Sequence, residues 1–376
     1  MDCNQVFVSK VKRLIVVFTL LIAFLSIKID TFAQVDSAVV PVDSVVAGSA
    51  EAVSGEHGAA KHGEEKFEPT KVIMEHIADS HMWHLWGHTS LPLPVILYTA
   101  NGLEVFSSGN FHHGEHDYNG KYNNYRLEED HIKVVGADGK IDEEASKSVL
   151  DFSITKNVAA MFVAILIILI VFISVARAYK KRVGKAPKGL QSLIEPIIVF
   201  VRDDIAKPNI GHKYAKFMPY LLTVFFFIWF NNLLGLIPIF PGGANVTGNI
   251  ALTFVMALGT MIIVNINGNK YYWKHILTPD VPWWLYPIMI PVELIGIISK
   301  PFALMIRLFA NITAGHIIVL SLISLIFIFE TAWISPVSVA FVIFMDVLEL
   351  LVAFLQAFIF TLLTALFIGM AVEEHH

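Results

Sequence analysis

Residues 286–328 have the sequence YPIMIPVELIGIISKPFALMIRLFANITAGHIIVLSLISLIFI, and residues 337–372 have the sequence VSVAFVIFMDVLELLVAFLQAFIFTLLTALFIGMAV. Each stretch exceeds the roughly 20 apolar residues that cross a bilayer as a straight helix. A helix of such length must tilt strongly or lie partly along the membrane plane. Because the connection between the two stretches is short, the sequence predicts an antiparallel hairpin of two long tilted helices.

Three further apolar runs precede this hairpin, and their cores lie at 157–179, 217–238 and 250–266. Residues 189–206 place apolar side chains at helical spacing among charged ones, which is typical of an amphipathic helix at the membrane surface. The chain has 55% hydrophobic residues and a mean hydropathy of +0.63. The sequence therefore predicts an all-α polytopic membrane protein, with about five membrane-embedded helices plus an interfacial helix.

Residues 1–33 have the pattern of a signal peptide. A basic cluster at 10–13 precedes an apolar run at 14–27, and Thr31-Phe32-Ala33 is a small-residue cleavage site. An uncleaved membrane anchor is the alternative interpretation. Cys3 is the only cysteine, so the sequence offers neither a disulfide framework nor a thiolate metal site within one chain.

Residues 34–155 are polar and rich in His, Gly, Glu and Asn, and we interpret them as an extracytoplasmic segment that is partly disordered at its start. Short apolar runs at 95–98, 103–106 and 131–135 predict small strands, and Asp138-Gly139 is a hairpin signal. This segment contains many histidines, including His76, His81, His84, His88, His112, His113 and His116. A metal site is one interpretation of this group. A solvated accessory surface is favoured, because no cysteine or recognised ligand frame accompanies the histidines, and no metal is expected.

The residues that follow the first apolar run set the orientation. They are strongly basic: Arg177, Lys180, Lys181, Arg182, Lys185 and Lys188. By the positive-inside rule this end lies in the cytoplasm, in agreement with a secreted N-terminal segment. We expect residues 156–376 to form the membrane domain of a multi-pass protein of the bacterial inner membrane, with an extracytoplasmic N-terminus after signal cleavage and a cytoplasmic C-terminus.

Ionisable residues lie at membrane depth in the first long stretch. Glu293, Lys300 and Arg307 recur every seven residues, close to two helical turns, and so share one face. Asn311 lies near the same face, whereas His316, nine residues after Arg307, faces the opposite way. Charged groups within a bilayer are costly, and by default they mark a pathway for ions or protons.

The second long stretch carries one polar stripe at helical spacing, formed by Asp346, Glu349, Ala353 and Gln356. In an antiparallel hairpin, positions equidistant from the turn approach one another. With the turn near residue 332, His316 falls at the depth of Glu349, and Arg307 falls at the depth of Gln356. The sequence thus predicts two polar couples inside the hairpin.

Four runs in the chain resemble the family of F-type ATP synthase subunit a. They are Ser299–His316 (SKPFALMIRLFANITAGH), Leu355–Thr364 (LQAFIFTLLT), Asn231–Pro238 (NNLLGLIP) and Ala244–Thr247 (ANVT). The resemblance covers residues 157–376, and the runs occur in the order found in the family. It implies that Arg307 is the family's obligatory arginine and that Gln356 is the glutamine of its last helix.

The resemblance also implies the remaining residues of a proton path. The family has a polar pair in the half-channel that opens to the outside, and here the pair is His316 and Glu349, in the reciprocal arrangement. Glu293 matches an acidic position of the half-channel that opens to the cytoplasm. Asn311 completes the set expected to take part in proton translocation.

The function implied by the resemblance is that of the ion-translocating stator subunit of F-type ATP synthase. Two offset half-channels would carry protons to and from the carboxylates of the c-ring, coupling the gradient to rotation and ATP synthesis. The expected partners are the c-ring, which meets the Arg307 face, the b-subunit peripheral stalk and membrane lipid. No catalytic residue, cofactor or nucleic-acid partner is expected, and protons are favoured over sodium as the coupling ion.

Structural roles are the alternative for each residue: an ion pair for Arg307, a helix-holding pair for His316 and Glu349, a surface pair for Glu293 and Lys300, and a helix start for Asp346. Rival functions have weaker support. A secondary transporter should show inverted repeats with two discontinuous helices, and we find none in the sequence. A membrane enzyme should show a nucleophile or metal motif, and no G-x-S-x-G, H-E-x-x-H or P-loop sequence is present.

Overall fold

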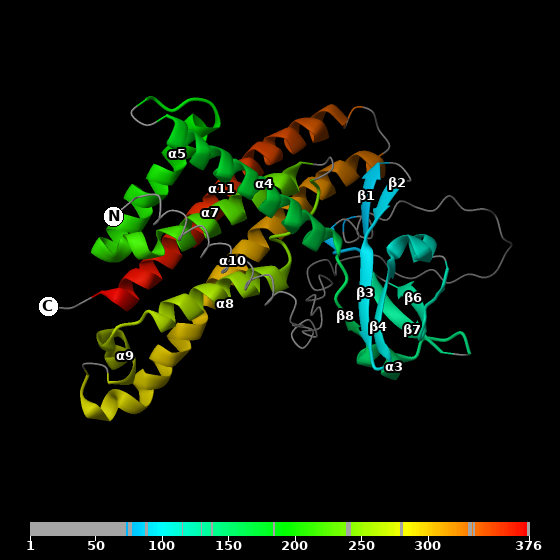
Figure 1. The fold of residues 1–376 in the computed structure, drawn as a ribbon, viewed down its shortest axis with the longest axis horizontal. Coiled ribbons are helices and arrows are strands. Elements are labelled where there is room, and N and C mark those ends of the chain that lie inside the picture. Colours follow the sequence, from blue (N-terminus) through cyan, green and yellow to red (C-terminus); the bar gives the residue numbers. More distant parts are fainter. Residues whose placement is uncertain are drawn as a thin grey trace, which may run out of the picture.

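The computed structural model describes residues 73, 77–86, 89–114, 116–128, 130–136, 138–182, 185–237, 242–278, 281–329, 333 and 335–373. The predicted signal peptide lies outside these residues. Two parts follow one another along the chain, a small β-rich domain and a helical membrane part (Figure 1).

The membrane part is entirely helical in the described residues. Its elements are α4 (Lys156–Lys181), α5 (Leu190–Phe200), a π-helical turn (Val201–Ala206), α6 (Lys207–Ile210), α7 (Tyr214–Leu236), α8 (Ile250–Ile266), α9 (Lys270–Leu277), α10 (Tyr286–Phe329) and α11 (Ser335–Val372), with short 3₁₀ turns at Gly211–Lys213 and Trp283–Leu285. Four helical segments in the described chain are long and apolar enough to span a membrane, and α8 and α9, bent by 103°, would together make a fifth. The predicted fold class is therefore confirmed.

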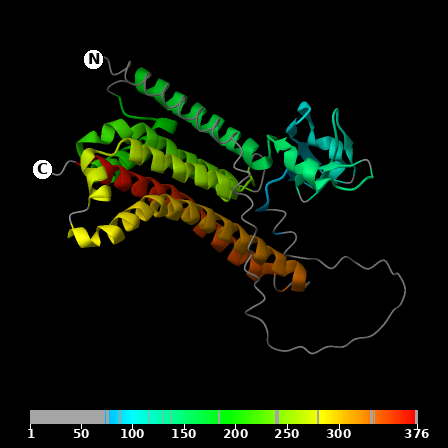
Figure 2. The same cartoon turned by 90° about the horizontal axis from the view of Figure 1, so that it is seen from below.

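The two long stretches form α10 and α11, which lie side by side as the predicted antiparallel hairpin (Figures 1 and 2). Near the turn between them, the two helices are joined by a hydrogen bond from Ser338 Oγ to the carbonyl of Leu322. The C-terminal end of α11 is fixed by Asn269, whose backbone N–H donates to Ala371 O at 2.8 Å and whose Nδ2 donates to Val372 O at 2.8 Å. These bonds satisfy carbonyls that a helix leaves unpaired at its C-terminus.

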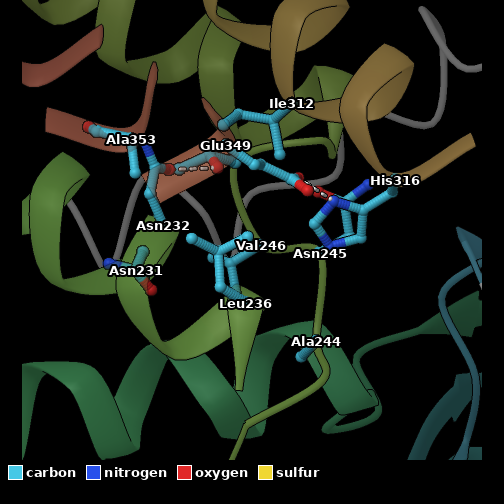
Figure 3. Close-up of a pocket in the computed structure, with 12 residues that line it drawn as sticks. Asn231, Asn232, Leu236, Ala244, Asn245, Val246, Ile312, His316, Glu349 and Ala353 are labelled. Carbon is cyan, nitrogen blue, oxygen red and sulfur yellow. Dashed lines mark hydrogen bonds and ion pairs between the residues drawn. The ribbon is translucent and has the colours of Figure 1, made fainter. Parts of the chain in front are cut away.

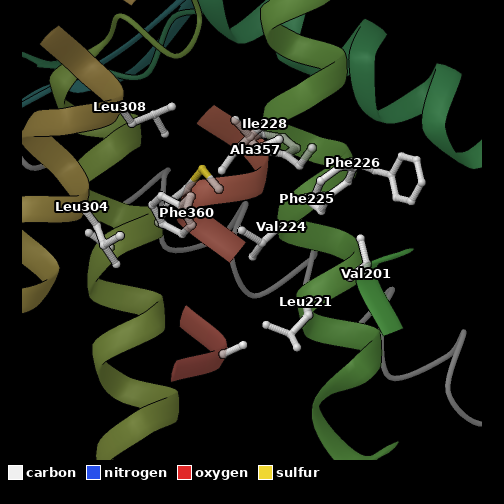
Figure 4. Close-up of a cluster of buried hydrophobic side chains, with 14 of the residues drawn as sticks. Val201, Leu221, Val224, Phe225, Phe226, Ile228, Leu304, Leu308, Ala357 and Phe360 are labelled. Carbon is white, nitrogen blue, oxygen red and sulfur yellow. The ribbon is translucent and has the colours of Figure 1, made fainter. Parts of the chain in front are cut away.

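Helix α7 packs between α11 and the predicted amphipathic segment. Phe225 and Ile228 of α7 are fully buried, and so are Ala357 of α11 and Val201 of the π-helical turn (Figure 4). Small residues allow helix backbones to approach closely, which is how helices gain packing contacts in lipid. The backbones of α11 and α6 approach especially closely at Gly369, because a side chain there would overlap the carbonyl of Asn209 in α6.

The β-rich domain contains β1 (Met82–Trp86), β2 (Thr89–Pro92), β3 (Pro94–Thr99), β4 (Gly102–Ser107), a 3₁₀ turn (Ser108–Gly114), β5 (Tyr118–Asn119), β6 (Asn124–Glu128), β7 (His131–Val135), α3 (Glu143–Ser148) and β8 (Leu150–Asp151). Strands β4-β3-β8 and β5-β6-β7 form two antiparallel sheets, beside the hairpin β1-β2. They enclose a core that includes Leu97, Phe111 and Tyr125. The three predicted strands correspond to β3, β4 and β7, and Gly139 adopts a positive φ of 73° in the predicted turn.

The domain joins the membrane part through the first turn of α4. The carboxylate of Asp79 accepts hydrogen bonds from Asn157 N at 3.0 Å and Thr155 Oγ1 at 2.8 Å. Lys156 N donates to Ser80 O at 2.8 Å. A carboxylate is favourable at this position because a helix N-terminus carries unpaired N–H groups and a partial positive charge. Trp83 of β1 also belongs to the same buried cluster as α4.

Candidate functional site

The predicted pair His316–Glu349 is present between α10 and α11. Nδ1 of His316 and Oε1 of Glu349 are 2.8 Å apart, and the two side chains are 11% and 7% exposed. The pair can form because the neighbouring residue is Gly315: a Cβ there would lie 2.8 Å from Oε1 of Glu349. The glycine therefore leaves the space that the carboxylate occupies.

A narrow polar pocket lies against this pair (Figure 3). Its walls come from the end of α7, the segment before α8, α10 and α11, and they consist of Asn231, Asn232, Gly235, Leu236, Ala244, Asn245, Val246, Thr247, Ile312, His316, Glu349 and Ala353. The space between these walls is too narrow for a whole water molecule. Gly235 faces the free ring nitrogen of His316, because a Cβ there would lie 4.0 Å from Nε2. One nitrogen of His316 thus faces Glu349 and the other faces the pocket.

The asparagines of the pocket differ in their hydrogen bonding. Asn245 is 3% exposed, and neither atom of its amide has a partner in the described structure. Asn231 donates to Phe227 O of its own helix at 2.7 Å, and its Oδ1 has no partner there. Asn232, in contrast, bonds to Thr247 and Ala353. Unpaired buried amide atoms are costly, so the pocket is an unusually polar space for a membrane interior.

In the sequence, Asn231–Pro238 and Ala244–Thr247 stand out only as runs that resemble the family, and no role follows for their individual residues. Polarity within an apolar segment was the signal that would have identified the asparagines. Their convergence on His316 could not be seen, because the segments are separated by more than 60 residues from His316.

The two members of the predicted couple Arg307–Gln356 lie in different surroundings. Arg307 and Asn311 are exposed on the outward face of α10, whereas Gln356 is 2% exposed in the interior. No hydrogen bond joins Arg307 to Gln356 in the described residues. The predicted polar stripe of α11 also divides, because Asp346 is exposed while Glu349 and Gln356 are buried. Equal predicted depth in the hairpin therefore did not give Arg307 and Gln356 the same surroundings.

A second polar space lies beside the N-terminal half of α10. It measures about 20 Å³ and is lined in part by Lys300, Asn265 and Tyr272, which is room for about one water molecule. Nζ of Lys300 lies 5.6 Å from the centre of the Phe367 ring. Glu293 is half-buried two turns earlier on α10 but does not line this space. In the described residues, no group of three or more His, Cys, Asp or Glu side chains is placed to hold a metal ion.

Comparisons with known proteins agree on one family. The family "ATP synthase A chain" matches residues 158–369, more than half of the chain. ATP synthase subunit a of Chlorobium phaeobacteroides is 41% identical over 382 aligned positions, covering 98% of this chain and 95% of the relative. ATP synthase subunit a 2 of Chlorobaculum tepidum is 41% identical over 338 positions, covering 88% and 79%. ATP synthase subunit a of Chloroherpeton thalassium is 50% identical over 233 positions, covering 60% and 69%.

The β-rich domain matches a different family, described as "Domain of unknown function (DUF8433)", over residues 72–152. The match begins before β1 and ends at β8, so it coincides with the domain seen in the structure. Most of the membrane part, including the signature run on α10, falls within the first match. On the strength of that match and of relatives that extend along nearly its whole length, this chain belongs to the family of ATP synthase subunit a.

Proposed function

We propose that this chain carries protons between the exterior and the c-ring of an F-type ATP synthase, and that His316 and Glu349 form the outer part of the path. The observation that carries the proposal is the buried His316–Glu349 pair, held between two membrane helices and open to a polar pocket on one side. A histidine is the side chain best suited to accept and release protons near neutral pH.

The two nitrogens of His316 give the path a direction. Nε2 faces the pocket beside Gly235, and Nδ1 is bonded to Glu349. A proton accepted at Nε2 leaves the ring charged, and the proton on Nδ1 can then pass to the carboxylate. The ring is then neutral with its proton on Nε2, and a rotation of the imidazole that turns this N–H toward Glu349 restores the starting arrangement. Because the pocket walls leave no room for water in this structure, entry requires a displacement of side chains around Asn245.

Arg307 lies on the face of α10 opposite to His316. Its guanidinium points away from the interior, where it is available to a c-ring carboxylate that has lost its proton. At a separation of about 4 Å and an effective dielectric constant near 20, a cation stabilises such a carboxylate by roughly 4 kcal/mol. Arginine cannot relay the proton itself, since it stays protonated at usable pH. Asn311, one turn further, shares this face, and buried Gln356 supports α11 behind it.

Glu293, near the polar space beside Lys300, belongs to the exit path toward the cytoplasm in this proposal. The chain itself has no catalytic role in ATP chemistry, which falls to other subunits. Its partners are the c-ring, the b-subunit stalk and lipid. Residues 1–33 are a cleaved signal peptide, residues 34–155 lie outside the cytoplasm, and residues 156–376 form the membrane domain, with the C-terminus in the cytoplasm of a bacterial cell.

Proton pumping by the whole complex in vesicles tests this function. Single replacements His316→Gln and Glu349→Gln should each slow ATP-driven pumping strongly, and the exchange His316→Glu with Glu349→His should recover part of it. Arg307→Ala should abolish pumping in assembled complexes. Ser321→Ala, an exposed position on the same helix whose hydroxyl bonds to Ile317 O, is the control. Unchanged pumping in Glu349→Gln complexes would contradict the proposed path.

A further inference from the structure

Asn232 occupies the point where α7, the segment before α8 and α11 meet. Its Nδ2 donates to the backbone carbonyl of Ala353 at 3.3 Å, and its Oδ1 accepts from Thr247 Oγ1 at 2.6 Å. The three residues are 3%, 0% and 1% exposed in the order Asn232, Ala353, Thr247. One amide thus connects three parts of the chain that are far apart in sequence.

The carbonyl that accepts the hydrogen bond from Asn232 lies one helical turn from Glu349, the carboxylate of the His316–Glu349 pair. Ala353 follows Glu349 by four residues and precedes Gln356 by three, so all three share one face of α11. A carbonyl oxygen has two lone pairs. Ala353 can therefore keep its bond within the helix and still accept from Asn232. The bond between helices acts one turn away from the carboxylate of Glu349.

We propose that Asn232 is a positioning residue that fixes the rotation and height of α11, so that Glu349 stays within hydrogen-bond reach of His316. Thr247 holds the amide in the orientation that aims Nδ2 at Ala353. This inference rests on the proposed proton path and adds a residue to it that touches neither the proton nor the pair.

Packing at this level is apolar: Ala353 and Ala357 are buried, and Phe354 lies against Phe225 and Trp229 of α7. Helices in lipid lack a hydrophobic drive toward one another, so a directional hydrogen bond adds a constraint on rotation and height that apolar contacts do not supply. The described links at the ends of α11, through Ser338 and through Asn269, lie about three and about six turns from Glu349. The link through Asn232 is the one placed at the height of the pair.

The chemistry of the link defines the test. Asn232→Leu removes both hydrogen bonds at similar volume. Asn232→Asp keeps the acceptor for Thr247 but cannot donate to Ala353 O while the carboxylate is ionised. Thr247→Val removes the bond that orients the amide, and Thr247→Ser keeps it. Thr223→Val is the matched control, because Thr223 Oγ1 bonds to Pro219 O within the same helix α7.

The measurement is ATP-driven proton pumping by the whole complex in vesicles, with the amount of assembled complex determined separately. We expect Asn232→Leu and Asn232→Asp to lose on the order of tenfold at neutral pH, the scale of loss for small misplacements of reacting groups. Thr247→Val should lose less, and Thr247→Ser and Thr223→Val should match the unaltered chain. As pH falls, Asn232→Asp should recover relative to the unaltered chain at the same pH, because a protonated carboxyl can donate, whereas Asn232→Leu should not.

The outcomes separate this inference from the proposed function. Full pumping by Asn232→Asp at a pH that ionises its buried carboxyl would show that the site needs polarity and not a donor, which overturns the link. If Asn232→Leu fails to assemble, Asn232→Asp and the two Thr247 variants decide the question in the same way. If Glu349→Gln leaves pumping intact, the proton path itself is wrong. If Glu349→Gln abolishes pumping while Asn232→Asp and Thr247→Val do not reduce it, only the positioning role is wrong.

Discussion

At the residue scale, the absence of a side chain at Gly315 is as important for the site as the charged residues are. Gly315→Ala would place a methyl group 2.8 Å from Oε1 of Glu349, so the carboxylate must move away from His316. We expect proton pumping to fall by at least about tenfold, because transfer depends on close approach of donor and acceptor. Assembly should persist, since Ala favours helix over Gly by about 1 kcal/mol.

Gly296→Ala is the matched control for this prediction. Gly296 lies on the same helix, and a Cβ there would meet no atom of the chain within 4 Å. Its pumping should equal that of the unaltered chain. Equal pumping by Gly315→Ala would mean that Glu349 does not need its bond to His316 for proton transfer.

At the element scale, the junction between the β-rich domain and α4 depends on pH. Nε2 of His81 lies 3.1 Å from Oδ2 of Asp151, and His81 is buried. Burial lowers the pKa of His81, but the hydrogen bond and charge of Asp151, with the charges of Asp79 and Asp130, raise it overall above its ordinary 6.5. Burial raises the pKa of Asp151, but the hydrogen bonds from His81 and Ser153, together with the charge of His81, outweigh burial and lower that pKa below 3.8.

The directions of the two pKa shifts determine the pH range in which the junction is most stable. A raised His81 pKa stabilises the folded junction below about pH 6.5, and this contribution is lost as pH rises through the raised value. A lowered Asp151 pKa stabilises it above about pH 3.8, and this contribution is lost as pH falls through the lowered value. The junction should therefore be most stable in mildly acidic medium and less stable in alkaline medium.

Hydrogen exchange at the amides of Lys156 and Asn157, which bond to Ser80 and Asp79, measures this change. Protection factors corrected for intrinsic exchange should fall as the medium becomes alkaline. In His81→Asn they should be low and nearly independent of pH. His131→Asn, at an exposed position on β7, should behave like the unaltered chain. A pH-independent profile in the unaltered chain would rule out the titration of His81 as the cause.

At the scale of the whole molecule, the β-rich domain and the end of the chain lie at opposite ends of the helical part (Figures 1 and 2). We propose that five crossings, by α4, α7, the bent α8–α9 pair, α10 and α11, separate them. Reporter fusions after Ser107 and after Glu373 should therefore report opposite sides of the membrane, with the first outside and the second in the cytoplasm. Reporters on the same side would require an even number of crossings and refute the arrangement.

The sequence by itself determined the helices, their order and one site contact. Helical periodicity and apolar length are local properties, so α8 and the long helices α10 and α11 begin and end close to the predicted residues. The pairing of His316 with Glu349 also followed from counting, because a short turn fixes which positions of a hairpin share a depth.

Only the tertiary structure decided which side chains of equal depth face one another. Arg307 points outward while Gln356 is buried, since rotation of each helix is set by all of its neighbours and not by its partner alone. The same packing gathers Asn232, Thr247 and Ala353 from three separate segments, and it leaves the space beside Gly315 for a carboxylate. Such contacts join residues far apart in the chain, where no local spacing rule applies.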